Sequence, residues 1–166
     1  MSLEAWTVWH GILGVIFIIA FAAVAEILWD ATPQRIGRLR FLMGVSVASV
    51  VLHVAIGTYV YQFYREAIPT SPRSLILAST RPWLHTILME YKEFVGGFVP
   101  ILTIAALYAI FYYGKRELTE KRGVRMGILG ILTAAFAFAL IAFAMGALIT
   151  KYAPLGGGLG GGLSGV

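Results

Sequence analysis

Residues 41–64 read FLMGVSVASVVLHVAIGTYVYQFY. This stretch of 24 residues contains no Lys, Arg, Asp or Glu, and its one histidine is His53. A helix of about 20 apolar residues is long enough to span a hydrocarbon core of roughly 30 Å. Because backbone groups in lipid must satisfy their hydrogen bonds within the segment, the stretch is predicted to be a transmembrane α-helix.

Three more apolar runs of similar length flank this one. Across the chain 59% of the residues are hydrophobic and only 13% are charged, whereas a soluble domain carries about 25% charged residues. We therefore predict an all-α membrane protein, a four-helix transmembrane bundle in residues 1–153. Its helices are expected at about 5–30, 41–64, 82–113 and 125–150.

The third of these helices is expected to begin in the outer interface. Thr80 followed by Pro82 is typical of a helix start, because proline is tolerated in the first turn. From Trp83 onward no breaker interrupts the apolar pattern until the run enters lipid. After the bundle, residues 154–166 are rich in glycine and are predicted to form a flexible tail.

The basic residues predict how the bundle lies in the cell membrane. Eight of the 13 Lys and Arg residues fall in the two short connections 31–40 and 114–125. Short loops rich in Lys and Arg stay in the cytoplasm, so both termini are predicted to lie outside. Because the charge follows the ends of apolar runs, the net charge of +5 indicates membrane topology, and no nucleic-acid partner is expected.

The chain contains no cysteine. This excludes disulfides, cysteine-ligated iron–sulfur clusters and covalently attached c-type haem. Any cofactor would be held by histidine, methionine, carboxylates or packing.

Two histidines with glycines one turn later are candidates for binding a cofactor. His53 lies near the middle of its run with Gly57 four residues on, and His10 has Gly14 at the same spacing. Histidine nitrogens beside small residues suit the iron and the macrocycle of a b-type haem, so His10 and His53 are predicted metal ligands and Gly14 and Gly57 are predicted cofactor contacts. The alternative is that the histidines hydrogen-bond across a helix interface and the glycines permit packing. An offset of about 10 Å in predicted depth also argues against one iron bound by both.

A second group of ionisable residues lies at the start of the third helix. His85, Glu90 and Glu93 are candidates for handling protons, as in exchange with a quinone, or for binding a metal ion. The alternative is that Lys92 and Glu93 form an ion pair at the headgroup boundary, where charges cost little.

These residues favour a small subunit of a respiratory or other redox complex that binds b-type haem or a quinone for electron transfer. The expected partners are the lipid bilayer and other membrane subunits, and we expect a subunit of an oxidoreductase complex, not an enzyme by itself. One alternative is a non-catalytic accessory subunit of a larger membrane complex. A second alternative is a small transporter or proton channel.

The predicted orientation can be tested at residue 119, because a cysteine placed there is the only one in the chain. In Thr119→Cys, an impermeant maleimide should label the protein only after intact cells are permeabilised. Labelling of intact cells would reverse the orientation.

Overall fold

The computed structural model describes residues 2–155, and every regular element in that range is a helix. Four α-helices are long: α1 (Leu3–Trp29), α2 (Ile36–Tyr64), α4 (Glu90–Glu120) and α5 (Arg122–Tyr152). A short helix α3 (Pro72–Ala78) and a π-helix η1 (Leu84–Met89) connect α2 to α4. The segments α1, α2, η1 with α4, and α5 are each long and apolar enough to cross a membrane. The chain is therefore a multi-pass membrane protein with four candidate spans, as the sequence predicted.

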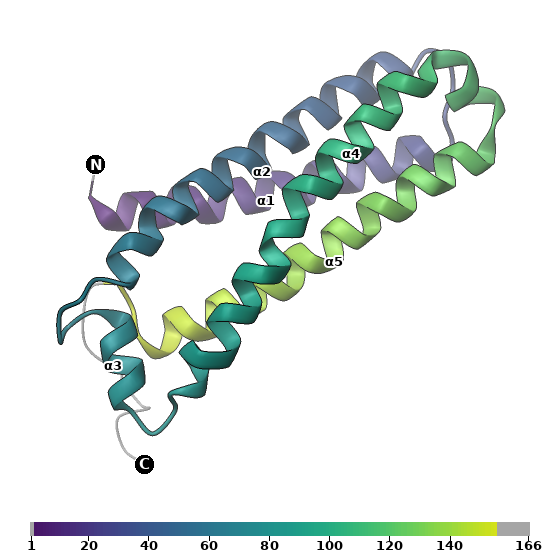
Figure 1. Cartoon of the computed structure of the whole chain (residues 1–166). Coiled ribbons are helices and arrows are strands. Elements are labelled where there is room, and N and C mark those ends of the chain that lie inside the picture. The colour runs from purple at the N-terminus through teal and green to yellow at the C-terminus, as the bar shows by residue number, and fades with distance from the viewer. Residues whose placement is uncertain (1, 156–166) are drawn as a thin grey trace.

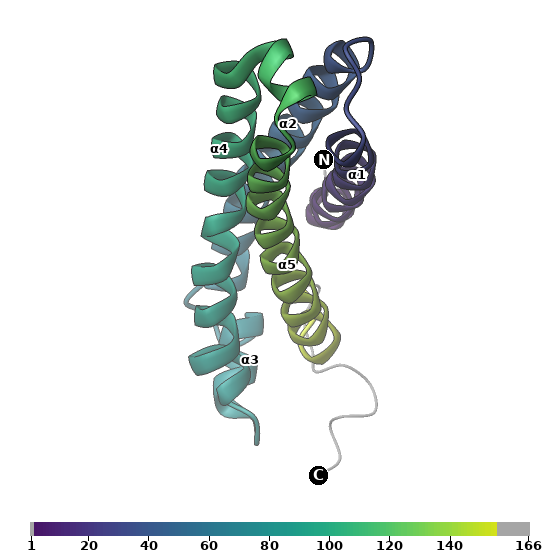
Figure 2. The ribbon, with the colours of Figure 1, turned by 90° about the vertical axis from the view of Figure 1, so that its right-hand side faces the viewer.

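The long helices form two antiparallel hairpins, α1 with α2 and α4 with α5, that pack side by side (Figures 1 and 2). Helix α2 also lies beside α4, and α1 lies beside α5. We call the end that carries the connections at residues 30–35 and 121 the basic end. The opposite end, which carries the start of α1 and the end of α5, is the terminal end.

Buried side chains form three clusters along the bundle. The cluster at the basic end contains large apolar side chains from all four long helices: Val24, Ile27, Leu28, Leu39, Met43, Ile110, Leu118 and Leu132 among them. In the middle, Phe17, Val50, Val99 and Ala135 pack together. The cluster at the terminal end contains Tyr64, Ile76, Leu84, Met89, Ile149, Tyr152 and Ala153, and none of these belongs to α1. Helix α1 therefore leaves the core as it approaches the terminal end.

Arg125 ties the two hairpins together at the basic end. Its guanidinium donates to the carbonyl of Leu28 at 3.1 Å and to those of Leu118 and Thr119 at 3.1 and 3.0 Å. These carbonyls belong to the last turns of α1 and α4, where no later backbone N–H is in place to bond them. Next to this link, Glu26 and Arg35 form an ion pair.

The connections at the basic end are shorter than the sequence indicated. The expected loop 114–125 is reduced to a break at Gly114, a further helical turn and Lys121 between α4 and α5. Gly114 has φ 69° and ψ −177°, which glycine adopts without a side-chain clash. Likewise α2 begins at Ile36 instead of residue 41, and Arg40 in its first turns lies over the ring of Phe111 at 4.9 Å.

The connection before α4 contains structure that the sequence did not predict. Ser71 caps α3 by accepting a hydrogen bond from the Ser74 N–H at 3.2 Å. Helical hydrogen bonding then begins at the predicted place, since the Pro82 carbonyl accepts from the Thr86 N–H at 3.1 Å. The six residues that follow form a π-helix in place of the expected α-helix. The predicted flexible tail lies outside the described residues, apart from Pro154 and Leu155.

Candidate functional site

His10 and His53 face each other where α1 and α2 pack together. The Nδ1 atom of His10 lies 2.9 Å from the backbone oxygen of His53, and Nδ1 of His53 lies 2.8 Å from the backbone oxygen of His10. The two rings are stacked with their centroids 3.6 Å apart and their planes 20° apart. We call this arrangement the histidine stack.

Each glycine one turn after a histidine makes room for the ring from the other helix. A Cβ atom at Gly57 would lie 2.8 Å from Cε1 of His10, a separation that real Cβ atoms do not show. A Cβ atom at Gly14 would lie 3.5 Å from Cε1 of His53, an ordinary contact. The same His-x-x-x-Gly unit thus occurs once on each antiparallel helix, and the two units bind each other.

The hydrogen bonds also fix which ring nitrogen carries the proton. A backbone carbonyl can only accept, so Nδ1 of each histidine must be the donor. In the neutral ring, Nε2 is then a hydrogen-bond acceptor without a proton. Among residues 2–155, neither Nε2 has a hydrogen-bond partner.

The histidine stack does not fit a haem held between its two rings. Two axial histidines must approach the iron from opposite faces of a macrocycle, whereas these rings touch face to face. The space beside Gly14 and Gly57 that could accept a macrocycle is filled by the imidazoles. The described residues also hold no group of three His, Cys, Asp or Glu side chains suited to a metal ion. Haem or metal binding by His10 and His53 stays a prediction that requires the stack to open.

Lys92, in the first turn of α4, is partly buried. Its side chain packs against Gly146 of α5, where a Cβ atom would lie 3.0 Å from the lysine Cε. Its charge interacts with both His10 and His53, and with Glu93 on the other side. Lys92 makes no hydrogen bond or ion pair with any residue in the described range 2–155. The sequence offered an ion pair between Lys92 and Glu93 as an alternative, and no ion pair joins them within residues 2–155.

His85 belongs to a separate cluster at the terminal end, with Tyr64 and Arg73. The π-helix η1 directs His85 inward, where the residue is only 5% exposed. Arg73 Nε donates to His85 Nε2 at 3.1 Å, and His85 Nδ1 lies 3.1 Å from the Tyr64 hydroxyl. Since arginine can only donate, Nε2 accepts and Nδ1–H donates to the tyrosine oxygen. Both nitrogens of His85 are therefore engaged, and neither is free to bind a metal.

Of the three predicted proton-handling residues, His85 is the one hydrogen-bonded to Tyr64. Glu90 and Glu93 both interact through their charges with Tyr64 and with His85. The two carboxylates are exposed, whereas Tyr64 and His85 are buried. Tyr64 and Arg73 were missed from the sequence, because nothing in the spacing of residues 64, 73 and 85 shows that α3 folds back against η1.

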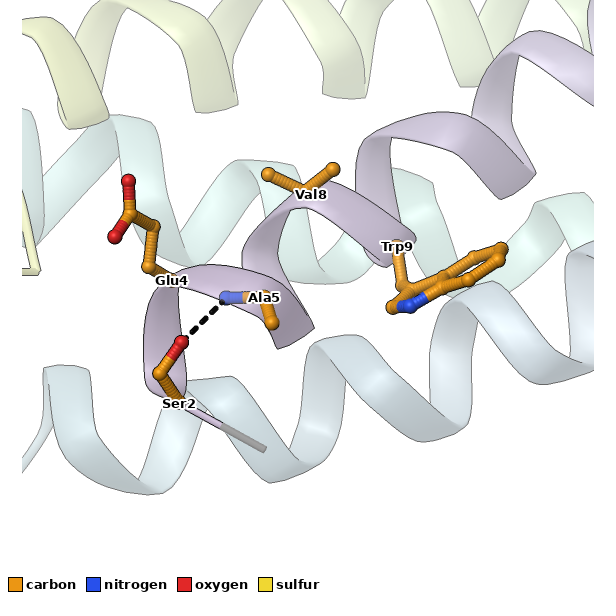
Figure 3. Close-up of a pocket in the computed structure, with 5 residues that line it drawn as sticks. All are labelled: Ser2, Glu4, Ala5, Val8 and Trp9. Atoms are coloured by element: carbon orange, nitrogen blue, oxygen red, sulfur yellow. Dashed lines mark hydrogen bonds between the residues drawn. The ribbon is translucent and has the colours of Figure 1, made fainter.

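A shallow hollow lies on the terminal turns of α1 (Figure 3). It has a volume of about 330 Å³, is open to the surroundings and is lined by Ser2, Glu4, Ala5, Val8 and Trp9. Glu4 supplies the one ionisable side chain of its lining.

No protein-family model, curated protein or solved structure matches this chain.

Gly57 has less free space beside it than Gly14 does, so Gly57→Ala and Gly14→Ala form a matched pair of variants. Each Gly→Ala change favours the helix by about 1 kcal/mol, but only Gly57→Ala places Cβ within 2.8 Å of His10. We expect Gly57→Ala to be less stable than Gly14→Ala by about 1–3 kcal/mol, the range for overpacking. Thermal unfolding in mild detergent measures this, and His10→Ala combined with Gly57→Ala should restore stability. Equal effects of the two glycine changes would contradict the stacked arrangement.

The stacked arrangement of His10 and His53 also predicts the visible spectrum of the protein. While the stack persists, the purified chain should show no haem α-band in a reduced-minus-oxidised visible spectrum. A sharp α-band with about one b-type haem per chain, lost in both His10→Ala and His53→Ala, would show that these histidines bind haem in place of stacking.

Proposed function

We propose that this chain is a small integral subunit of a membrane redox complex and handles protons for a quinone in the terminal half of the bundle. The observation that carries the proposal is the set of ionisable side chains gathered there: His10, His53, His85, Lys92 and Glu93. Ionisable groups within membrane-spanning segments are costly, and they mark proton relays and ligand sites. A bundle that needed only to pack would not require them.

These groups extend from the connection before α4 into the bundle. Arg73, His85 and Tyr64 are joined by hydrogen bonds, and Glu93 links them through its charge to Lys92. Lys92 in turn interacts with the histidine stack. His53 lies eleven residues before Tyr64 on α2, or roughly 16 Å along the helix. Groups able to hold a proton thus reach from the terminal end to well inside the span.

A quinone suits this arrangement better than a haem does. Its headgroup needs only hydrogen-bond donors and acceptors such as imidazole, tyrosine and ammonium groups, and its apolar tail enters from lipid. The chain itself carries no cysteine to hold an iron–sulfur cluster. Electrons would therefore pass to or from another subunit of the complex.

The chain is also a candidate for a structural accessory subunit, because α5 presents small residues on its outside. Gly127, Gly130 and Ala134 are exposed, and a Cβ atom at either glycine would have nothing within 4 Å. Small residues let a neighbouring transmembrane helix approach closely. In this second proposal, the polar interior serves only to hold the helices together.

A proton channel through one chain is less well supported. Within the described residues, the interior at the basic end consists of apolar side chains such as Leu39, Ile110 and Leu132. Protons that enter from the terminal end would have to cross this apolar cluster.

Glu93→Gln separates the two main proposals, with Glu120→Gln at the basic end as its control. In membranes where the variant replaces the native chain, Glu93→Gln should slow quinol-dependent electron transfer by about 100-fold or more and alter its pH profile. Glu120→Gln should change neither, and both variants should assemble normally because both carboxylates are exposed. An unchanged rate in Glu93→Gln, with loss of the complex when the chain is deleted, would favour the accessory subunit.

A further inference from the structure

Arg40 has no hydrogen-bond or ion-pair partner in the part of the chain that the structure describes. It lies in the first turns of α2, and its guanidinium carbon is 4.9 Å from the centre of the Phe111 ring on α4. Its Nε atom is buried and makes no hydrogen bond within residues 2–155. Because unsatisfied buried donors are uncommon in folded proteins, this one points to an acceptor that the described chain does not supply.

The carboxylates of the basic end are engaged by other basic residues. Segments 26–40 and 114–125 hold eight Lys and Arg residues against four Asp and Glu residues. Three of these four carboxylates form ion pairs: Glu26 with Arg35, Glu117 with Lys121 and Glu120 with Arg116. The basic end therefore carries more positive charge than its own carboxylates neutralise, and this charge attracts an anion.

Arg40 lies at the boundary between lipid and headgroups. It immediately precedes the 24-residue apolar run of α2, and the two phenylalanines beside it, Phe41 and Phe111, are 70% and 55% exposed. Gly37 and Gly44, one turn before and one turn after Arg40, are also exposed, and a Cβ atom at either would meet nothing within 4 Å. A lipid molecule can therefore approach the guanidinium closely along α2.

We propose that Arg40, held over Phe111, binds the phosphate of an anionic phospholipid. The amino groups at the tip of the guanidinium are less enclosed than Nε, and they donate to the phosphate oxygens, an arrangement that suits a planar guanidinium. The face of the Phe111 ring holds the cation where α2 packs against α4. This site is at the opposite end of the bundle from His85 and Glu93 and does not depend on the proposed redox function.

The charge and the position of the site together select the ligand. A zwitterionic phospholipid carries the same phosphate, but its ammonium group is repelled by the excess of basic residues at this end. Inorganic phosphate has the required charge but gains nothing from the lipid-facing side chains around Arg40. An anionic phospholipid satisfies the guanidinium and also places its acyl chains along the exposed, apolar face of α2.

The test uses the full chain in a nonionic detergent and native mass spectrometry at physiological ionic strength, with phosphatidylglycerol as the probe and phosphatidylcholine for comparison. We expect the first phosphatidylglycerol to bind at least about tenfold more tightly than phosphatidylcholine. Arg40→Gln should weaken phosphatidylglycerol binding by about tenfold or more. Arg38→Gln removes the same charge from the same helix, but Arg38 is exposed and screened by salt, so it should change binding by less than about twofold.

Gly44→Leu tests the same site without removing a charge. A helical side chain leans over the preceding turn, so the leucine fills the open space beside Arg40 while the contacts inside the bundle remain. This variant should weaken phosphatidylglycerol binding, as Arg40→Gln does. Gly130→Leu, at an exposed glycine of α5 with equally open surroundings, should leave binding unchanged.

Equal losses in Arg40→Gln and Arg38→Gln would show a diffuse attraction to the basic end and would overturn the site. Unchanged binding in Gly44→Leu, or equal binding of the two lipids, would also overturn it. Displacement of phosphatidylglycerol by an equal concentration of inorganic phosphate would assign Arg40 to a soluble anion instead. If Arg40→Gln does not fold, the comparison of Gly44→Leu with Gly130→Leu decides the question.

Discussion

A polar side chain inside a bilayer must find its partners within protein, because no water is there to supply them. The histidine stack meets this requirement with two reciprocal hydrogen bonds. Each imidazole donates to the backbone of the other helix, and each helix provides a glycine that makes room for the ring it receives. The close approach of α1 and α2 therefore depends on these four residues.

The same constraint divides the bundle into two unlike halves. Toward the basic end the interior is apolar, and the Arg125 guanidinium donates hydrogen bonds to carbonyls at the ends of α1 and α4. Toward the terminal end, Tyr64, Arg73 and His85 form a hydrogen-bonded network, and Lys92 interacts through its charge with Glu93. A polar network whose members satisfy one another makes this end of the bundle rigid.

The sequence predicted the spans well because length and hydrophobicity alone decide what crosses a membrane. It also identified His10, His53 and their glycines as a unit, and it included hydrogen bonding across an interface among the alternatives. The offset of about 10 Å between the histidines was misleading, because it assumed that both helices end at the same depth. The Tyr64–Arg73–His85 network could not be foreseen. It depends on the fold-back of α3 and on the π-helix, which moves His85 to a different face from the one that α-helical spacing assigns.

The apolar cluster at the basic end also determines how the chain would sense a membrane potential. Moving one elementary charge across the full membrane is worth about 2.3 kcal/mol per 100 mV. Most of that voltage drops where the dielectric constant is low, which in this bundle is the half lined by residues such as Leu39, Met43 and Leu132. A proton that enters from the terminal surface and stops short of this cluster crosses only part of the field. The remaining work against the membrane potential falls to whatever carries charge past the apolar half.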